Sequence, residues 1–407
     1  MADETNSGNS SPRGSNQRSF TNRLRRAFRG EVDARTVALE VVRRSRAAFH
    51  QRRERADLDQ LNTRPARLHS KYANLYPDHL LAHFRDRTEP KFLRGFVRSF
   101  EPTVPAFKIQ TATITPTVAK PNEWLRDPVS GIVWPLDYHL DLKLQRGDGS
   151  DVRVLWELNR LGHFVELAAA YTATRDEKHA KEFFVQMEDW RKANPVGRGP
   201  NWACAMEVAL RAMNLLAAFA AFRHSPEMDA ARLQVMLAMF EQHGEFIRRN
   251  LEFSYIATSN HYLSDVVGLL WLGIMLPELR AAHAWRKFGL REMLHEMEVQ
   301  ILPDGADFES STGYHRLTLE LFMYSFILCR ENGIEIESRY WGRLRGMVAY
   351  LRAYVRPDGR APLVGDTDGG QALPVVNRDG DDHAYLAAVG AALFEDPALK
   401  INDESAP

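Results

Sequence analysis

The chain has 407 residues, of which 44% are apolar, and its 53 basic side chains are matched by 53 acidic ones. A zero net charge gives no molecule-wide positive field, which argues against nucleic acid as a partner and requires any polyanion site to be local. No uninterrupted run of about 18 apolar residues occurs, so we expect no membrane span. Cys204 and Cys329 show no metal-ligand or disulfide spacing, so we expect both to be buried and expect no metal or cofactor.

The first 55 residues are predicted to be disordered at the start and basic afterwards. Residues 1–22 are rich in Ser, Asn and Gly and cannot bury enough apolar surface to fold. Residues 18–55 hold 12 Arg against four acids, and this excess has two interpretations. It forms either a basic arm for an anionic polymer or a solvated helix face with Val37 and Val41 on its other side. The first thirty residues lack the apolar core of a secretory signal, so a cytoplasmic location is expected if the N-terminus is complete.

Residues 56–150 are predicted to be an irregular region with few helices. They contain nine prolines, and proline interrupts a helix because it lacks the backbone N–H. The stretch FKIQTATITPTVA, residues 107–119, is rich in β-branched residues and predicts short strands.

Residues 151–400 change to long segments of helical period that come in pairs. First members begin near residues 154, 203, 259 and 314, and the first of them is predicted to be one helix over 154–174. First members such as 262–276 are apolar nearly all round, whereas second members such as 339–355 have one apolar stripe and an arginine-rich back. Buried inner helices with amphipathic outer helices predict an all-α fold, an incomplete α/α toroid. The alternative, a solenoid of the armadillo type, has shorter and more uniform repeats.

The most polar stretches of this half precede the inner helices: NPVGRGPNW, SNHYLSD and DGADFESSTGYHR. Inner helices of a toroid run in the same direction, so these stretches should meet on one face. That face would bring together five residues: Asn201, Asn260, His261, Tyr314 and His315. Helix N-termini present unpaired N–H groups and positive partial charge, so an acidic polymer is the expected ligand. Each residue also has a purely structural interpretation, since Asn260 can cap a helix and either histidine can be a bonded interior residue.

Three side chains of the second inner helix, Glu207, Arg211 and Asn214, are predicted to lie on its inner face. A charge there is costly unless it is paired, so Glu207 and Arg211 either form a mutual ion pair or orient His261 or a substrate carboxylate. Trp202, just before this helix, either packs in the core or stacks on a sugar ring.

Five sequence blocks together resemble the heparinase II/III-like polysaccharide lyases, a family that includes heparin-sulfate lyases and related alginate lyases. The resemblance covers residues 70–400, and the blocks are VRVLWELNRLGHF, NPVGRGPNWACAMEVALRAMN, SNHYLSDVVGLLWLGIMLPE, ILPDGADFESSTGYHRLTLE and VRPDGRAPLVGDTDGGQ. It implies an N-terminal α/α toroid, a C-terminal antiparallel β-sandwich and an active cleft between them. It also implies that Tyr314 is the acid/base, that Asn260 binds the uronate carboxylate with help from His261, and that a sandwich histidine is a further base.

The sequence stops at Pro407, soon after the block GDTDGG at 365–370, so we expect it to lack the family's β-sandwich. Three explanations are open: the chain is a fragment, a separate β-sandwich chain is its partner, or catalysis has been lost. The resemblance also implies a periplasmic location.

The predicted function is β-elimination of a uronate-containing acidic polysaccharide, in which the C5 proton leaves, the bond from C4 to the glycosidic oxygen breaks, and an unsaturated sugar remains. We assign Tyr314, Asn260 and His261 to catalysis. The predicted substrate-binding residues are Asn201, Trp202, Glu207, Arg211, His315 and Arg316. Tyr314 can act as an acid unaided, but as a base it needs a neighbouring cation, His315 or Arg316, to stabilise the phenolate.

Three other functions are open from the sequence. A uronate C5-epimerase would abstract the same proton and return it to the other face. A non-catalytic acidic-glycan-binding or assembly module would bind polymer without product. A toroid hydrolase would need two facing carboxylates, for which Glu207, Glu309 and Asp304 are the candidates.

Overall fold

A computed structural model describes residues 33–92, 107–109, 112–114, 123–366, 370–374 and 379–401. The stretch predicted to be disordered, residues 1–22, lies outside these described residues. Within them, the regular structure is helical except for one two-stranded antiparallel sheet. Its strands, β1 (Phe107–Ile109) and β2 (Ala112–Ile114), lie in the stretch that the sequence predicts to form strands.

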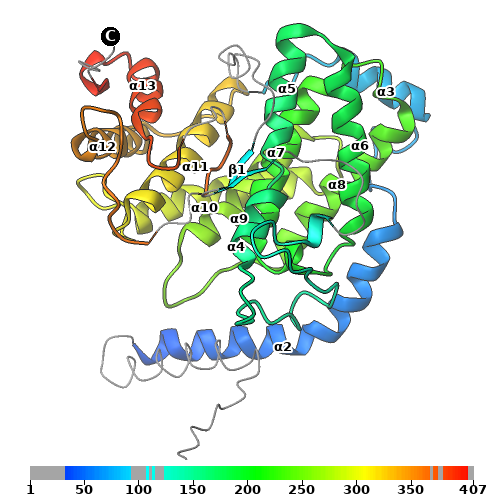
Figure 1. Ribbon diagram of the computed structural model, residues 1–407, viewed down its shortest axis with the longest axis horizontal. Helices are drawn as coiled ribbons and strands as arrows, with labels where there is room; N and C mark the ends of the chain where they lie inside the picture. Colours follow the sequence, from blue (N-terminus) through cyan, green and yellow to red (C-terminus); the bar gives the residue numbers. More distant parts are fainter. Residues whose placement is uncertain are drawn as a thin grey trace, which may run out of the picture.

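The first described helix, α2 (Ala34–Thr63), crosses the boundary at residue 55 that the sequence predicts. The Asp33 side chain caps its N-terminus, and the helix ends just before Pro65, whose ring disfavours helical backbone in the preceding residue. Its last turns reach the core through Leu58, which is 1% exposed. The N-terminal half extends along one edge of the body (Figure 1). Two short helices follow in the irregular region: α3 (Pro77–Asp86) and the 3-10 helix η1 (Glu123–Leu125).

From residue 163 onward the helices form consecutive inner and outer pairs that succeed one another across the body (Figure 1). The inner helices are α5 (His163–Thr174), α7 (Ala205–Phe222), α9 (Asn260–Met275) and α11 (Thr312–Glu331). The outer helices are α6 (Glu177–Ala193), α8 (Ala230–Arg249), α10 (Ala282–Gln300) and α12 (Ser338–Tyr354). Each inner helix packs against its own outer partner and against the next inner helix. The predicted all-α, incomplete α/α toroid is confirmed.

Three shorter helices lie outside these pairs, one before α7 and two after α12. The 3-10 helix η2 (Pro200–Trp202) precedes α7, and α13 (Ala384–Leu393) packs on α12 together with η3 (Pro397–Leu399).

The inner helices approach one another closely where α9 crosses α7. A Cβ at Gly268 of α9 would lie 2.7 Å from the Cβ of Ala209 on α7, closer than real Cβ atoms come. The two small residues therefore set the distance between these helices, and with it the spacing of their N-terminal ends.

The first inner segment is two helices rather than the single helix predicted over 154–174. Helix α4 (Val152–Asn159) ends before Leu161, whose φ of 59° is left-handed, and α5 starts two residues later. A left-handed residue cannot continue a right-handed helix, so the chain turns here. The turn exposes the carbonyls of Asn159 and Arg160 to other donors, Arg211 and Asn214 respectively. The break thus ties the first inner segment to α7.

Helix α7 is long and apolar enough to cross a membrane by length and composition alone, which the sequence reading did not anticipate. It is 89% buried inside the protein, and the core helix of a water-exposed domain passes the same test. One such helix is a weak indication of a membrane span.

Candidate functional site

Helix α9 begins with two of the predicted catalytic residues, Asn260 and His261. Ser259 caps the helix by accepting the N–H of His261 at 3.3 Å. Both the backbone N–H and the side-chain Nδ2 of Asn260 donate to Glu309 Oε1 at 2.8 Å. The Oδ1 atom of Asn260 is buried and has no hydrogen-bond partner among the described residues. The carboxylate of Glu309 therefore binds at the N-terminus of α9, where the positive partial charge of the helix favours an anion.

His261 faces outward and is paired with an acid. Its side chain is 43% exposed, and its Nδ1 lies 2.7 Å from Oε2 of Glu252. Burial acts to lower the pKa of His261, but the Glu252 carboxylate outweighs burial and raises that pKa to about 9. Burial likewise acts to raise the pKa of Glu252, and His261 overcomes it and lowers the pKa to about 2. With Nδ1 engaged, Nε2 is the ring nitrogen left for a ligand.

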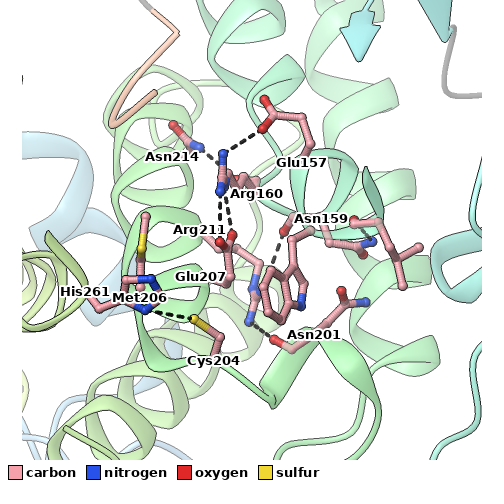
Figure 2. Close-up of polar contacts among 12 residues, drawn as sticks. Glu157, Asn159, Arg160, Asn201, Cys204, Met206, Glu207, Arg211, Asn214 and His261 are labelled. Carbon is pink, nitrogen blue, oxygen red and sulfur yellow. Dashed lines mark hydrogen bonds and ion pairs between the residues drawn. The ribbon is translucent and has the colours of Figure 1, made fainter. Parts of the chain in front are cut away.

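Glu252, which the sequence reading missed, joins the starts of α7 and α9. Its Oε1 accepts from the N–H of Met206 and from the thiol of Cys204, both at 3.1 Å. Cys204 is the N-cap residue of α7 and its Sγ lies 3.8 Å from His261 Nδ1 (Figure 2). Glu252 stands in the loop 251–259, which has no periodicity or motif that could have identified it.

Glu207 pairs with Arg160, so of the two interpretations of Glu207 and Arg211 the mutual ion pair is wrong. Arg160 donates to both carboxylate oxygens of Glu207, at 2.7 and 2.8 Å, and to Glu157 at 2.6 Å (Figure 2). Both side chains of the pair are about 5% exposed. Arg160 is the C-cap residue of α4, directly before the left-handed Leu161, so it lies at the break between α4 and α5.

Arg211 lies deeper, behind this pair. Its guanidinium donates to the carbonyl of Asn201 at 2.8 Å and to Nε2 of His243 at 3.0 Å, and it lies 4.6 Å from the ring centroid of Trp190. Burial lowers the pKa of Arg211 to about 9. Arg211 is 1% exposed, so it holds the chain around α7 in place and does not face a ligand in this conformation.

Asn201 and Trp202 are also interior residues, 0% and 1% exposed. The Asn201 amide donates to Oδ1 of Asn194 at 2.7 Å, and the indole N–H of Trp202 donates to the Asn194 carbonyl at 3.2 Å. Of the two interpretations of Trp202, the structure shows core packing. With no exposed ring face, it does not stack on a sugar here.

Tyr314 lies in the first turn of α11, partly exposed. Its backbone N–H donates to the capping hydroxyl of Ser311 at 3.1 Å, and its phenol donates to Oδ2 of Asp366 at 3.4 Å. The loop that delivers it also carries Glu309, the acceptor for Asn260. The structure thus links the N-termini of α9 and α11 through Glu309, and directs the phenol of Tyr314 to Asp366.

His315 and Arg316 are both 1% exposed, so in this structure neither side chain faces a ligand. His315 Nε2 lies 3.1 Å from the Met347 carbonyl, and burial lowers the pKa of His315 to about 4, so the ring is neutral at pH 7. Arg316 forms a buried ion pair with Glu320 at 3.0 Å. A neutral imidazole and a neutralised guanidinium give Tyr314 little help as a base. The site therefore favours Tyr314 as a proton donor.

The profile of the heparinase II/III N-terminus matches residues 59–378, well over half of the sequence. The chain belongs to the heparinase II/III family. The heparin-sulfate lyase of Pedobacter heparinus is 29% identical over 238 residues, which are 57% of this chain and 35% of that protein. The heparin-sulfate lyase of Bacteroides stercoris is 26% identical over 253 residues, covering 56% of this chain and 37% of that protein.

Solved heparinase III structures share the fold. The heparan sulfate lyase HepC from Pedobacter heparinus aligns with a TM-score of 0.51 at 23% identity, over 78% of this chain and 49% of that one. A second crystal structure of heparinase III aligns with a TM-score of 0.52 at 17% identity, over 79% and 49%. This heparinase II/III family chain thus spans about half the length of the structures it matches and about a third of its curated relatives.

Proposed function

We propose that this chain supplies the toroid side of a polysaccharide lyase cleft that acts on a uronate-containing acidic polysaccharide by β-elimination. The observation that carries the proposal is the joining of two helix N-termini: Asn260 and His261 start α9, and Glu309 connects them to the loop that delivers Tyr314. The heparin-sulfate lyases among its relatives support the same reaction class.

The first task of such a site is to neutralise the uronate carboxylate, because the C5 proton is otherwise too weakly acidic to remove. Asn260 Nδ2 and the Nε2 side of His261 are the donors for this carboxylate. Glu309 now accepts from Asn260, so the substrate carboxylate would replace Glu309 there, one carboxylate for another. The Glu252 partner keeps the His261 ring fixed while this happens.

The second task is protonation of the leaving group. A base takes the C5 proton, the electron pair forms the C4=C5 bond, the bond from C4 to the glycosidic oxygen breaks, and the Tyr314 phenol gives its proton to that oxygen. His315 is neutral and Arg316 is paired with Glu320, so neither is a free cation that would stabilise a phenolate, and we assign Tyr314 the role of proton donor. The base is expected from a β-sandwich, and a separate chain as its source stays a prediction.

The test is ultraviolet absorbance of the C4=C5 bond after the full chain is mixed with heparan sulfate or alginate and with imidazole, which takes the place of the expected sandwich histidine as the base. Absorbance should rise with the native chain and should be lost with Tyr314→Phe. It should also rise with the control Tyr76→Phe, because Tyr76 is an exposed tyrosine far from Tyr314 in the sequence. Solvent deuterium at C5 without cleavage would instead indicate an epimerase. Salt-sensitive binding without either product would indicate a glycan-binding module, and equal activity in both variants would refute the assignment of Tyr314.

A further inference from the structure

Three side chains with metal-binding atoms converge beside the start of α9, from three separate segments. They are Cys204 at the N-cap of α7, Glu252 in the loop after α8, and His261 in the first turn of α9. Their ligand atoms, Sγ, a carboxylate oxygen and Nδ1, all lie within 4.8 Å of one another. Figure 2 shows Cys204 directed toward His261.

The separations are close to those of a tetrahedral zinc site. Zn–S bonds of about 2.3 Å and Zn–N or Zn–O bonds of about 2.1 Å place neighbouring ligand atoms roughly 3.4 to 3.6 Å apart. Cys204 Sγ lies 3.8 Å from His261 Nδ1. Of the two Glu252 oxygens, Oε1 lies 3.1 Å from Cys204 Sγ and Oε2 lies 2.7 Å from His261 Nδ1. The three ligand atoms lie within 4.8 Å of one another, so movements of about 1 Å would bring them to the separations of a zinc site.

The present contacts mark the positions that a metal would take. The Cys204 thiol donates to one oxygen of Glu252, and the His261 ring is paired with the other. A proton therefore lies between sulfur and oxygen in the first contact and between nitrogen and oxygen in the second. A metal ion would displace these protons, because it binds the thiolate and the unprotonated ring nitrogen.

The surroundings hold the acidic ligand in place. Asp265, one turn beyond His261 on α9, is 0% exposed and accepts the backbone N–H of Glu252 at 2.7 Å. Its other oxygen, Oδ1, is buried and has no hydrogen-bond partner in the part of the chain that the structure describes. Supporting bonds of this kind fix ligand orientation in metal sites.

The site can also be reached from solvent. The His261 and Glu252 side chains are 43% and 30% exposed, while Cys204 closes the inner side at 7%. One sulfur, one imidazole nitrogen and one carboxylate oxygen suit zinc and its neighbours in the first transition row, and do not suit magnesium or calcium.

We propose that Cys204, Glu252 and His261 form a binding site for a divalent cation of the zinc type. Three protein ligands leave at least one coordination position open. Ligation through Nδ1 leaves Nε2–H of His261 as a donor, so a metal ion and the proposed carboxylate contact are compatible. The metal site stands without the proposed lyase activity. The sequence gives no sign of it, because positions 204, 252 and 261 match no short ligand motif.

The experiment is titration of the full chain, after chelator treatment, with Co²⁺ as a spectroscopic substitute for Zn²⁺. One equivalent should produce a thiolate-to-cobalt charge-transfer band, and Zn²⁺ should displace it. The band should disappear in Cys204→Ser and remain in Cys329→Ser, a matched control because Cys329 is the other buried cysteine and is 0% exposed.

A second variant covers the case in which Cys204→Ser does not fold. Glu252→Gln keeps the shape of the side chain but removes the charge, and should weaken Co²⁺ binding at least about tenfold. Absence of a charge-transfer band in the native chain, an equal band in Cys204→Ser, or unchanged affinity in Glu252→Gln would each overturn the metal site. None of these readouts depends on lyase activity, so the two proposals can fail separately.

Discussion

The buried pair of Arg160 and Glu207 gives an asymmetric prediction for stability. Among the described residues, the side chain that donates to the Glu207 carboxylate is Arg160. Arg160, in contrast, donates to two carboxylates, those of Glu207 and Glu157. Arg160→Met therefore leaves a carboxylate that is 3% exposed without its cation, whereas Glu207→Gln leaves the cation with a second acid.

The magnitudes follow from burial and bonding. Removing one partner of a buried ion pair costs about 3 to 5 kcal/mol, which is the expectation for Arg160→Met. Glu207→Gln weakens two charge-assisted hydrogen bonds but keeps an acceptor oxygen, so we expect a loss of about 1 to 2 kcal/mol.

Equilibrium urea unfolding of the two variants measures these costs directly. Arg153→Met is the matched control: its ion pair with Asp151 is 52% and 39% exposed, and its loss should cost under about 1 kcal/mol. The reasoning is refuted if Glu207→Gln destabilises the chain as much as Arg160→Met, or if Arg160→Met behaves like the exposed control.

Two further predictions concern packing and pH. Gly268→Ala should lower the free energy of unfolding by about 1 to 3 kcal/mol, because the new Cβ would clash with Ala209. The control Gly342→Ala, whose Cβ would meet no described atom within 4 Å, should leave the stability unchanged or raise it. Thermal unfolding measures both. Burial raises the pKa of Asp307 to about 7, so the folded chain keeps a proton that the unfolded chain loses, and the stability contributed by this group falls as pH rises from about 4 through 7. Asp307→Asn should therefore reduce the fall in melting temperature between pH 5 and 8. Asp304→Asn, which changes an exposed neighbour, should not. An equal fall in melting temperature for the native chain and Asp307→Asn would contradict this.

The helix pairs and their polar N-termini were predictable from the sequence because their signals are local. Ser259 before Asn260, and Ser311 before Tyr314, are capping residues that precede apolar runs. The break at Leu161 was not predicted, because leucine rarely adopts left-handed backbone and the only helix-breaking residue nearby in the sequence is Gly162. Once that break was missed, Arg160 could not be placed opposite Glu207.

The composition of the site was harder to predict than its position. Glu252 reaches His261 and Cys204 from an aperiodic loop, and only the folded chain shows the contact. Conversely, Trp202, Arg211, His315 and Arg316 carry functional groups that suggest ligand binding, yet all are buried. Sequence distinguishes polar from apolar residues, but it does not separate a side chain that faces a ligand from one that bonds within the interior.

The most direct test of the shared face at the N-termini of α9 and α11 is hydrogen–deuterium exchange with and without a heparan sulfate oligosaccharide. We expect protection in peptides covering 252–263 and 308–316, and little change in the basic helix α2. Protection confined to α2, or no protection in the two peptides, would contradict the account.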